Sequence, residues 1–125
     1  MSTYPIVGAY YRPPAQAILK VLPLGTTLTL VAEPDNEHDP NAIAIWLYTK
    51  DVPEICDERL EELLPDYGST IEDFRNQEMY HLGYVPREMA ATLRARNTVP
   101  ADSPVEGSFS LSTGGAPRVR LSELV

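Results

Sequence analysis

Residues 33–45, EPDNEHDPNAIAI, carry a polar loop directly into an apolar alternation. Residues 35–41 are polar or turn-forming throughout, whereas residues 42–48 (AIAIWLY) alternate in the manner of a strand. Because successive side chains of a strand point to opposite faces, this pattern predicts one face buried in a core. The inward set is Ile43, Ile45 and Leu47, and the other face carries Trp46 and Tyr48.

Apolar or alternating runs on both sides of this segment predict further strands. They are residues 5–11, 17–22, 26–32, 80–85, 105–112 and 118–125. Pro13 and Pro14 end the first run, since proline cannot occupy a central strand. Gly114 and Gly115 predict a hairpin between the last two runs. Six or seven short strands, with twelve prolines at element edges, indicate a small barrel or sandwich.

Residues 51–78 interrupt the β pattern and predict two short helices. The first has one apolar stripe at helical spacing and ends at Pro65 and Gly68. That stripe is Cys56, Leu60, Leu63 and Leu64. Ser69-x-x-Glu72 predicts a capping box at the start of the second helix. A third helix is expected after Pro86, with Met89, Ala90 and Leu93 on its apolar side. The expected class is mainly β with helices (α+β).

The composition indicates one soluble domain spanning residues 1–125. A chain of 125 residues that is 43% hydrophobic and 22% charged can bury a core and is not typical of disorder. No apolar run approaches the roughly 20 residues that span a bilayer, so no membrane association is expected. Residues 1–14 lack the pattern of a secretion signal. The single cysteine excludes an internal disulfide and is typical of a reducing cytoplasm, so we expect a cytoplasmic protein.

The negative charge is concentrated in one part of the chain. Residues 50–78 carry ten acidic and three basic side chains, which supplies −7 of the net charge of −8. Neutralising phosphates provides most non-specific affinity for nucleic acid, so this charge argues against indiscriminate binding. The rest of the chain is close to neutral, which is compatible with a nucleic-acid surface elsewhere.

The loop does not match a metal site. Residues 35–39 begin like a calcium loop, but Pro40 stands where an EF-hand needs glycine and Trp46 where it needs glutamate. One cysteine and two histidines are too few for a structural zinc site. A nucleophile elbow, a phosphate-binding glycine loop and a paired-histidine motif are all missing from the sequence. We therefore expect no metal, no cofactor and no catalytic residue, which indicates a non-enzymatic protein.

Aromatic residues are common on the predicted strands. They are Tyr10, Tyr11, Trp46, Tyr48, Tyr80 and Tyr84. Exposed rings beside basic and amide side chains suit single-stranded nucleic acid, because bases stack on flat faces. Trp46 and Tyr48 are expected to pack in the core, whereas Tyr11 and Tyr84 fit either role.

Three blocks of sequence, IVGAYYRPP (6–14), LVAEPDNEHDPNAIAI (30–45) and LGYVPREMAATL (82–93), resemble the HIRAN domain. That family has a glycine-containing first strand ending in aromatic residues, an E-P-x-N-x-x-D-x-N-A-I segment, and a G-x-(V/I)-(P/K)-x-x-(L/M)-A helix start. The resemblance, to free-standing bacterial or phage members in particular, implies an OB-like β barrel with flanking helices. It also implies binding of single-stranded DNA, especially its free 3′ end.

The resemblance implies a set of DNA-binding residues. Tyr11 corresponds to the aromatic on which a base stacks. Asn36 and Asp39 match the residues that bond the terminal nucleotide, the aspartate accepting from the 3′ hydroxyl. Arg87 stands where members place a basic residue near phosphate, and Tyr84 stands at a position that other members fill with histidine. The full set is Tyr10, Tyr11, Arg12, Asp35, Asn36, His38, Asp39, Tyr84 and Arg87.

Three of these positions depart from the family pattern. Tyr10 replaces a frequent arginine, although Arg12 follows it closely. Asp35 replaces an asparagine of some members, and His38 replaces the loop aromatic. Losing an arginine and gaining a carboxylate both weaken the attraction for phosphate. The acidic residues 50–78 stand where members usually have a short hairpin.

Some of these residues also have structural readings. Asp39 is expected to accept hydrogen bonds from backbone N–H groups of the loop. Asn41 is expected to form a hydrogen bond with the loop backbone at the start of the strand. His38 is expected to be exposed. Gly83 is expected to allow close backbone packing or a bulge. Arg94 and Arg96 suit a solvated helix face, although with Arg87 they form the densest basic cluster of the chain.

Two classes of function stay open. The first is a non-enzymatic DNA-binding module for single strands or their 3′ ends, accessory to replication, repair or a mobile element. The second is a protein-interaction module or inhibitor that has lost DNA binding and uses residues 51–78 as its surface. A nuclease-associated subunit, with catalysis on another chain, is a third and weaker hypothesis.

Overall fold

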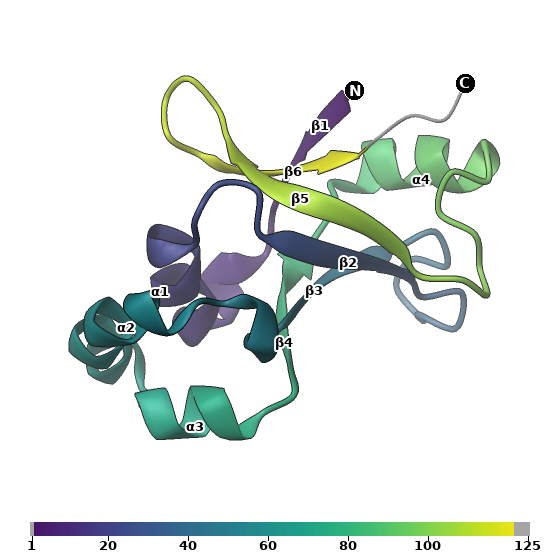
Figure 1. Cartoon of the computed structure of the whole chain (residues 1–125). Coiled ribbons are helices and arrows are strands. Elements are labelled where there is room, and N and C mark those ends of the chain that lie inside the picture. The colour runs from purple at the N-terminus through teal and green to yellow at the C-terminus, as the bar shows by residue number, and fades with distance from the viewer. Residues whose placement is uncertain (1, 122–125) are drawn as a thin grey trace.

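The computed structural model describes residues 2–121. Six strands, four α-helices and four short 3-10 turns follow one another along these residues (Figure 1). In chain order they are β1 (Ser2–Pro5), η1 (Ala9–Tyr11), α1 (Pro13–Val21), β2 (Thr27–Ala32), β3 (Ile43–Tyr48), η2 (Thr49–Asp51), η3 (Glu54–Cys56), α2 (Asp57–Leu63), η4 (Leu64–Tyr67), α3 (Ile71–Asn76), β4 (Met79–Tyr84), α4 (Arg87–Ala95), β5 (Val105–Leu111) and β6 (Pro117–Leu121).

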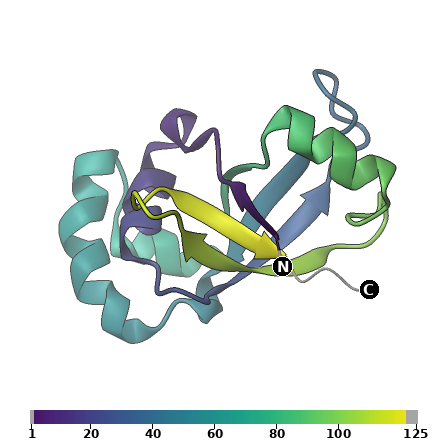
Figure 2. The ribbon, with the colours of Figure 1, turned by 90° about the horizontal axis from the view of Figure 1, so that it is seen from above.

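The strands form one antiparallel sheet in the order β1-β6-β5-β2-β3-β4. This sheet curls into a half-barrel, and the N-terminal segment joins its two ends. β1 pairs with β6 (Figure 2), and Val7, two residues further on, bridges to Tyr84 of β4. The bridge has two backbone bonds, Val7 N to Tyr84 O at 2.9 Å and Tyr84 N to Val7 O at 2.8 Å. The predicted OB-like α+β class with six strands is confirmed.

Gly83 makes this closure sterically feasible. A Cβ atom at this position would lie 2.3 Å from the carbonyl oxygen of Val7, far inside van der Waals contact. The β3–β4 register also shifts between Ile45 and Trp46, opposite Gly83 and His81, so a bulge bends β4 here. Both expected roles of Gly83, close packing and a bulge, are therefore present.

The core lies inside the half-barrel and extends under the helices. The predicted inward set of β3, Ile43, Ile45 and Leu47, is fully buried, and β2 adds Leu28 and Leu30. On the helical side the buried residues are Ala15, Ala17, Ile18 and Leu19 of α1, Leu60 of α2, Phe74 of α3, and Ala90 and Leu93 of α4. None of the helices within residues 2–121 is long and apolar enough to cross a membrane.

Two predicted strands are wrong. Residues 17–21 belong to α1 and Leu22 is its C-cap; the helix begins at the proline pair, and Pro13 and Pro14 occupy its first turn, where a missing N–H costs no helical bond. The predicted strand 5–11 ends at Pro5, apart from the Val7 bridge. Gly8 then adopts the left-handed conformation (φ 88°) and turns the chain into η1. α1 is thus a fourth α-helix where two or three helices were predicted.

Smaller differences concern element ends. The cap of α3 is Thr70 rather than Ser69: its hydroxyl accepts from the backbone N–H of Asp73 at 3.1 Å. Pro86 is the cap residue that precedes α4 rather than its first helical residue. Of the predicted strand 118–125, residues 122–125 lie outside the described residues.

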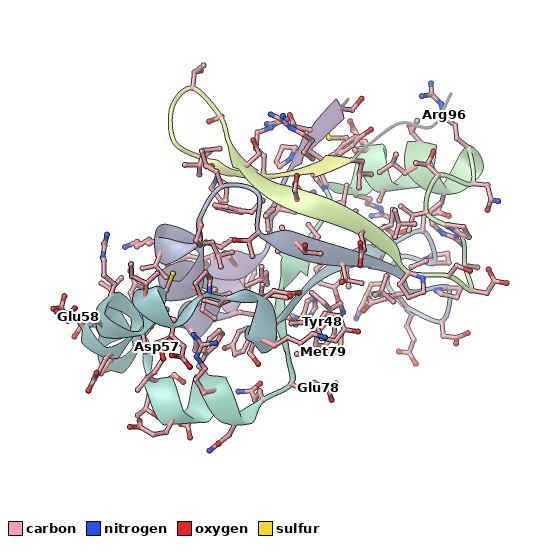
Figure 3. All side chains as sticks on the ribbon, viewed as in Figure 1. Tyr48, Asp57, Glu58, Glu78, Met79 and Arg96 are labelled. Atoms are coloured by element: carbon pink, nitrogen blue, oxygen red, sulfur yellow. The ribbon has the colours of Figure 1, made fainter. Side chains whose placement is uncertain are left out.

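Residues 50–78, called the acidic segment below, lie at the opposite end of the molecule from α4 (Figure 1). Nine of the ten carboxylates are exposed, and Figure 3 shows Glu58 projecting from α2. The half-buried one, Asp57, is ion-paired with Arg75. Arg75 also donates to the carbonyl of Thr49 at 2.7 Å and to that of Pro53 at 3.3 Å. One arginine therefore ties α3 to α2 and η2.

Candidate nucleic-acid interface

Two tyrosines project from the 3-10 turn η1. Tyr10 and Tyr11 are 79% and 81% exposed, and their rings meet edge to face with centroids 5.4 Å apart. The left-handed Gly8 creates this turn directly after the Val7 bridge. Large exposed apolar side chains that lie next to one another often mark an interaction site. The turn therefore presents two rings where the N-terminal segment closes the barrel.

Arg12, the next residue, reaches back onto β4. Its Nε donates to Nδ1 of His81 at 3.1 Å, and its guanidinium lies 5.7 Å from the ring centroid of Tyr84. His81 in turn stacks on Trp46 of β3, with ring centroids 4.7 Å apart and planes 15° from parallel. Arg12, which follows η1, and aromatic groups from β3 and β4 thus form one packed cluster on the outer face of the sheet.

The contacts of His81 define its charge state. Because Nδ1 accepts from Arg12, the ring proton belongs on Nε2, which donates to the carbonyl of Gly83 at 3.0 Å. Burial lowers the pKa of His81, and the positive charge of Arg12 lowers it further. His81 is therefore a neutral acceptor that orients Arg12.

Glu33 connects this cluster to the loop of residues 33–41. Its Oε1 accepts from the hydroxyl of Tyr84 at 3.0 Å and from the side-chain amide of Asn36 at 3.0 Å. Burial raises the pKa of Tyr84, and its hydrogen bond to Glu33 raises it further, so this hydroxyl stays a donor at neutral pH. One carboxylate oxygen therefore fixes the loop against β4.

Inside the loop the polar side chains build the turn. Oδ1 of Asn36 accepts from the backbone N–H groups of His38 at 2.9 Å and Asp39 at 3.1 Å. Oδ1 of Asp39 accepts from the backbone N–H of Asn41 at 2.9 Å. Oδ2 of Asp39 lies 3.7 Å from Nε of Arg87, whose side chain is 78% exposed against 17% for the aspartate. The loop is thus preorganised before any ligand arrives.

The structure brings five of the nine predicted site residues into one chain of contacts. These are Arg12, Tyr84, Asn36, Asp39 and Arg87, and they are linked through Glu33. Tyr10 and Tyr11 precede Arg12 on the turn. Asp35 and His38 are exposed in the loop and are not joined to this chain of contacts by their side chains within residues 2–121.

Sequence reasoning missed Glu33, His81 and Trp46 as members of the site. Glu33 opens the E-P-x-N pattern, so its place in that motif was an available signal. Trp46 was expected in the core, yet its ring is only partly buried and covers His81. His81 carried no usable signal, because its role depends on Arg12, 69 residues earlier in the chain.

The charge of this surface is mixed. The loop contributes Glu33, Asp35, Glu37 and Asp39, whereas the neighbouring cations are Arg12 and Arg87. Electrostatic attraction for a phosphate backbone is therefore weak here. The same surface offers two exposed rings, guanidinium groups and fixed acceptors, which suit stacking and hydrogen bonding at a few nucleotides. Among residues 2–121, no group of three or more His, Cys, Asp or Glu is placed to hold a metal ion.

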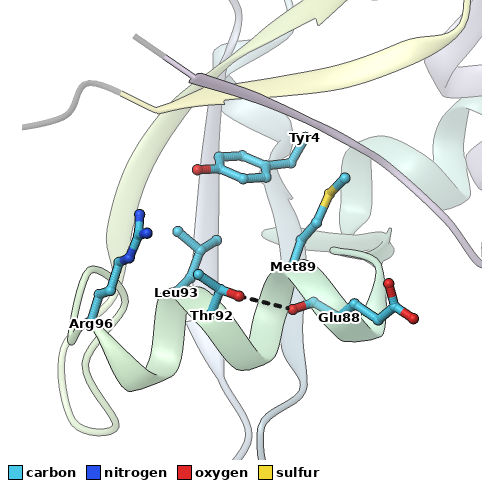
Figure 4. Close-up of a pocket in the computed structure, with 6 residues that line it drawn as sticks. All are labelled: Tyr4, Glu88, Met89, Thr92, Leu93 and Arg96. Atoms are coloured by element: carbon cyan, nitrogen blue, oxygen red, sulfur yellow. Dashed lines mark hydrogen bonds between the residues drawn. The ribbon is translucent and has the colours of Figure 1, made fainter.

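Away from these residues, a hollow of about 350 Å³ lies between β1 and α4 (Figure 4). Tyr4, Met89 and Leu93 form its apolar walls, and Arg96 stands at one end. The Thr92 hydroxyl at its edge donates to the backbone carbonyl of Glu88 at 3.3 Å, a bond within the helix. The hollow contains none of the predicted site residues.

The fold and the site define an OB-like binding module with stacking rings beside a hydrogen-bonded loop. The family model of the HIRAN domain matches residues 1–96, and the chain belongs to this family of DNA-binding domains. The HIRAN domain itself binds DNA and is not catalytic. No curated protein and no solved structure matches the chain. The match ends before β5 and β6, which complete the sheet.

Proposed function

We propose that the protein binds single-stranded DNA at its free 3′ end, as a non-enzymatic accessory to replication, repair or a mobile element. The observation that supports this most directly is Oδ2 of Asp39, which accepts no hydrogen bond within residues 2–121 and has only the longer, 3.7 Å ion-pair contact with Nε of the exposed Arg87. Its partner oxygen is occupied by the Asn41 N–H, and the side chain is largely buried in the preorganised loop. A fixed carboxylate oxygen of this kind is suited to accept a hydrogen bond from a terminal hydroxyl.

The other residues take roles that match their exposure. Tyr11, and Tyr10 beside it, are stacking surfaces for the last bases, because their faces are open to solvent. Arg12 uses Nε for His81, so its Nη groups serve a phosphate. Arg87 is long, exposed and only 3.7 Å from Asp39, so it bonds the phosphate next to the terminal sugar. Asn36 holds the loop, and at most one of its amide hydrogens is left for a ligand.

Fluorescence anisotropy with three labelled DNAs tests this proposal. A single strand ending in a 3′ hydroxyl should bind more tightly than the same strand ending in a 3′ phosphate, and more tightly than a blunt duplex. A phosphate at that position places negative charge against Asp39, so the preference should exceed about tenfold.

Asp39→Asn is the informative variant. It should remove the preference for the 3′ hydroxyl, whereas Glu37→Gln, an exposed carboxylate of the same loop, should leave it unchanged. Equal affinity of the wild-type protein for all three DNAs would exclude recognition of the end.

A second candidate function is favoured by the surface of the acidic segment. It has nine exposed carboxylates, and it also carries Ile55, which is 86% exposed and is an unusual side chain to leave in water. This combination suits a basic protein partner with an apolar pocket. The protein would then be an interaction module or an inhibitor, with or without DNA.

Charge reversal at Glu58, Glu61 and Glu62 tests the second candidate. All three are exposed, and the Asp57–Arg75 pair that holds the segment together is left intact. An affinity-purified partner should be lost, while circular dichroism and thermal unfolding stay unchanged. Retention of the partner by the reversed variant would rule this surface out.

A further inference from the structure

A groove of about 600 Å³ begins beside the exposed tyrosines and runs between α1, α2 and the β5–β6 hairpin. The described residues that line it are Ala9, Gln16, Leu19, Lys20, Leu22, Arg59, Phe109, Leu111, Gly115 and Pro117. In Figure 2 the hairpin lies over α1 and near α2, at the end of the molecule away from α4. We call this feature the α1–hairpin groove.

We propose that the α1–hairpin groove is a second DNA subsite, which holds the strand on the 5′ side of the captured end. This inference rests on the proposed function, since it extends the same bound strand. Four of the lining residues, Phe109 to Pro117, lie beyond residue 96, where the family match ends. The groove therefore depends on parts of this chain that the family match does not include.

The groove is continuous with the tyrosine pair. Ala9, which lines its edge, belongs to the same three-residue turn as Tyr10 and Tyr11. Gln16 also lines it, and the side-chain amide of Gln16 donates to the backbone carbonyl of Tyr10 at 3.3 Å. Because Ala9 is adjacent to Tyr10 in the chain, a DNA strand that stacks on these rings could continue into the groove.

The lining has the chemistry that a single strand needs. Its floor is apolar: Leu19, Leu22 and Phe109 are buried, and Leu111 is 43% exposed at the rim. An apolar lining accommodates the faces of bases without reading their hydrogen-bonding edges, so it does not select a sequence. Gln16, Lys20 and Arg59 add one amide and two cations, which are the groups that bond phosphate.

The charge of the groove contrasts with the rest of the protein. The chain has 18 acidic residues, yet none of the ten lining residues is acidic. From α2, which carries five acidic or basic side chains out of seven residues, only Arg59 lines the groove.

Its two cations are not neutralised. Within residues 2–121 the ion pairs are Arg75–Asp57 and Arg87–Asp39, so neither Lys20 nor Arg59 has a carboxylate partner. Lys20 donates to the hydroxyl of Tyr67 at 2.6 Å, a neutral group that positions its ammonium and leaves its charge available. Repulsion from the exposed carboxylates of α2 keeps a bound strand close to Lys20 and Arg59, whose positive charges are not neutralised.

The salt dependence of binding tests the proposal, because each lost phosphate contact of a single strand lowers the slope of log K against log salt concentration by about 0.7. The double variant Lys20→Gln/Arg59→Gln is compared with wild type on two 3′-hydroxyl oligonucleotides, one of about 3 and one of about 12 nucleotides. On the longer strand the slope should fall by about 1.4 and the affinity by about tenfold at low salt. On the shorter strand both should be unchanged.

Two controls separate this effect from others. Arg96→Gln/Arg120→Gln removes the same charge from two exposed arginines outside the groove, Arg96 lying at the far end of the molecule (Figure 3), and should leave both slopes unchanged. Tyr67→Phe removes the hydrogen bond to Lys20 but keeps the charge, and should leave both slopes unchanged as well.

Equal slopes for wild type and the Lys20/Arg59 variant on the longer strand would overturn the groove proposal while leaving end capture intact. The same holds if the Arg96/Arg120 variant loses as much as the groove variant. Conversely, a groove effect without preference for the 3′ hydroxyl would retain the groove and exclude end recognition. Failure of the wild-type protein to bind either oligonucleotide would exclude both.

Discussion

The loop of residues 33–41 and the acidic segment of residues 50–78 are both rich in carboxylates, but their carboxylates have different surroundings. In the loop, Glu33 and Asp39 are half-buried and accept hydrogen bonds from side chains or backbone. In the acidic segment nine of ten are exposed. Residue type alone therefore does not separate an architectural carboxylate from a solvated one; the donors around it do. Substitutions matched between the two regions should give unequal effects.

The largest difference is expected between two glycines. Gly83→Ala places a Cβ against the Val7 carbonyl and opens the bridge that closes the barrel, so it should cost about 3 kcal/mol or more of unfolding free energy. Gly68→Ala, at the end of η4 in the acidic segment, meets nothing within 4 Å and should cost about 1–2 kcal/mol from its left-handed backbone alone. Urea denaturation measures both. Equal losses would mean that the close approach at Gly83 is not structurally important.

The next difference concerns two glutamates. Glu33→Ala deprives Tyr84 and Asn36 of their shared acceptor and should cost about 2 kcal/mol, because two half-buried donors lose a partner. Glu58→Ala on the surface of α2 should change stability by less than about 0.5 kcal/mol. The same denaturation experiment measures both. A cost at Glu58 as large as at Glu33 would contradict the contrast between the two regions.

Exposed apolar side chains extend the comparison to binding. Tyr11→Ala should weaken the binding of single-stranded DNA by about 1–3 kcal/mol, which is the usual loss for one stacked base. The free energy of unfolding should change by less than about 0.5 kcal/mol. Ile55→Ala, at a similarly exposed site in the acidic segment, should leave DNA affinity unchanged. Anisotropy titrations measure both. Retained affinity in the Tyr11 variant would remove the ring from the binding surface.

The smallest effect is a pH dependence at His81 of β4, for which the acidic segment has no counterpart because it contains no histidine. The pKa of His81 is lowered from 6.5 in the folded protein, so below about pH 6.5 the unfolded chain binds more protons at this site. Stability should therefore rise with pH through the region just below 6.5 and fall on acidification. In His81→Gln this part of the profile should flatten, and unfolding free energies measured from pH 5 to 7.5 would show it. Parallel profiles for the two proteins would refute the assignment.

The strands could be predicted from the sequence where every second residue is apolar, because such a strand buries one of its two faces. β2 and β3 are the clearest cases, because Leu28, Leu30, Ile43 and Ile45 point to the same core. α1 could not be predicted in this way. Its apolar run is short and its buried stripe is wide, including the neighbouring Ala17, Ile18 and Leu19, so the periodicity does not distinguish a helix from a strand. The proline pair signalled a helix start as much as a strand end.

The site was partly predictable for a similar reason. Asn36 and Asp39 lie in one short segment that matches the E-P-x-N-x-x-D-x-N-A-I motif. Glu33, which was not predicted as a site residue, is the first residue of the same motif. The cluster of Arg12, His81 and Trp46 joins three elements far apart in the chain. The cluster forms only when the barrel is closed, and barrel closure cannot be predicted from residue spacing or composition. The roles assigned to the nine site residues stay predictions until binding is measured.

The N-terminal segment that closes the barrel also carries Tyr10, Tyr11 and Arg12, within five residues of the Val7 bridge. Opening the bridge should therefore displace these three residues as well, and on the proposed function a ligand bound to them should stabilise the closed form of the sheet. By mass action, DNA at 100 times its dissociation constant should stabilise the closed form by about 2.7 kcal/mol. The backbone amides of Val7 and Tyr84 should then exchange with deuterium roughly a hundredfold more slowly.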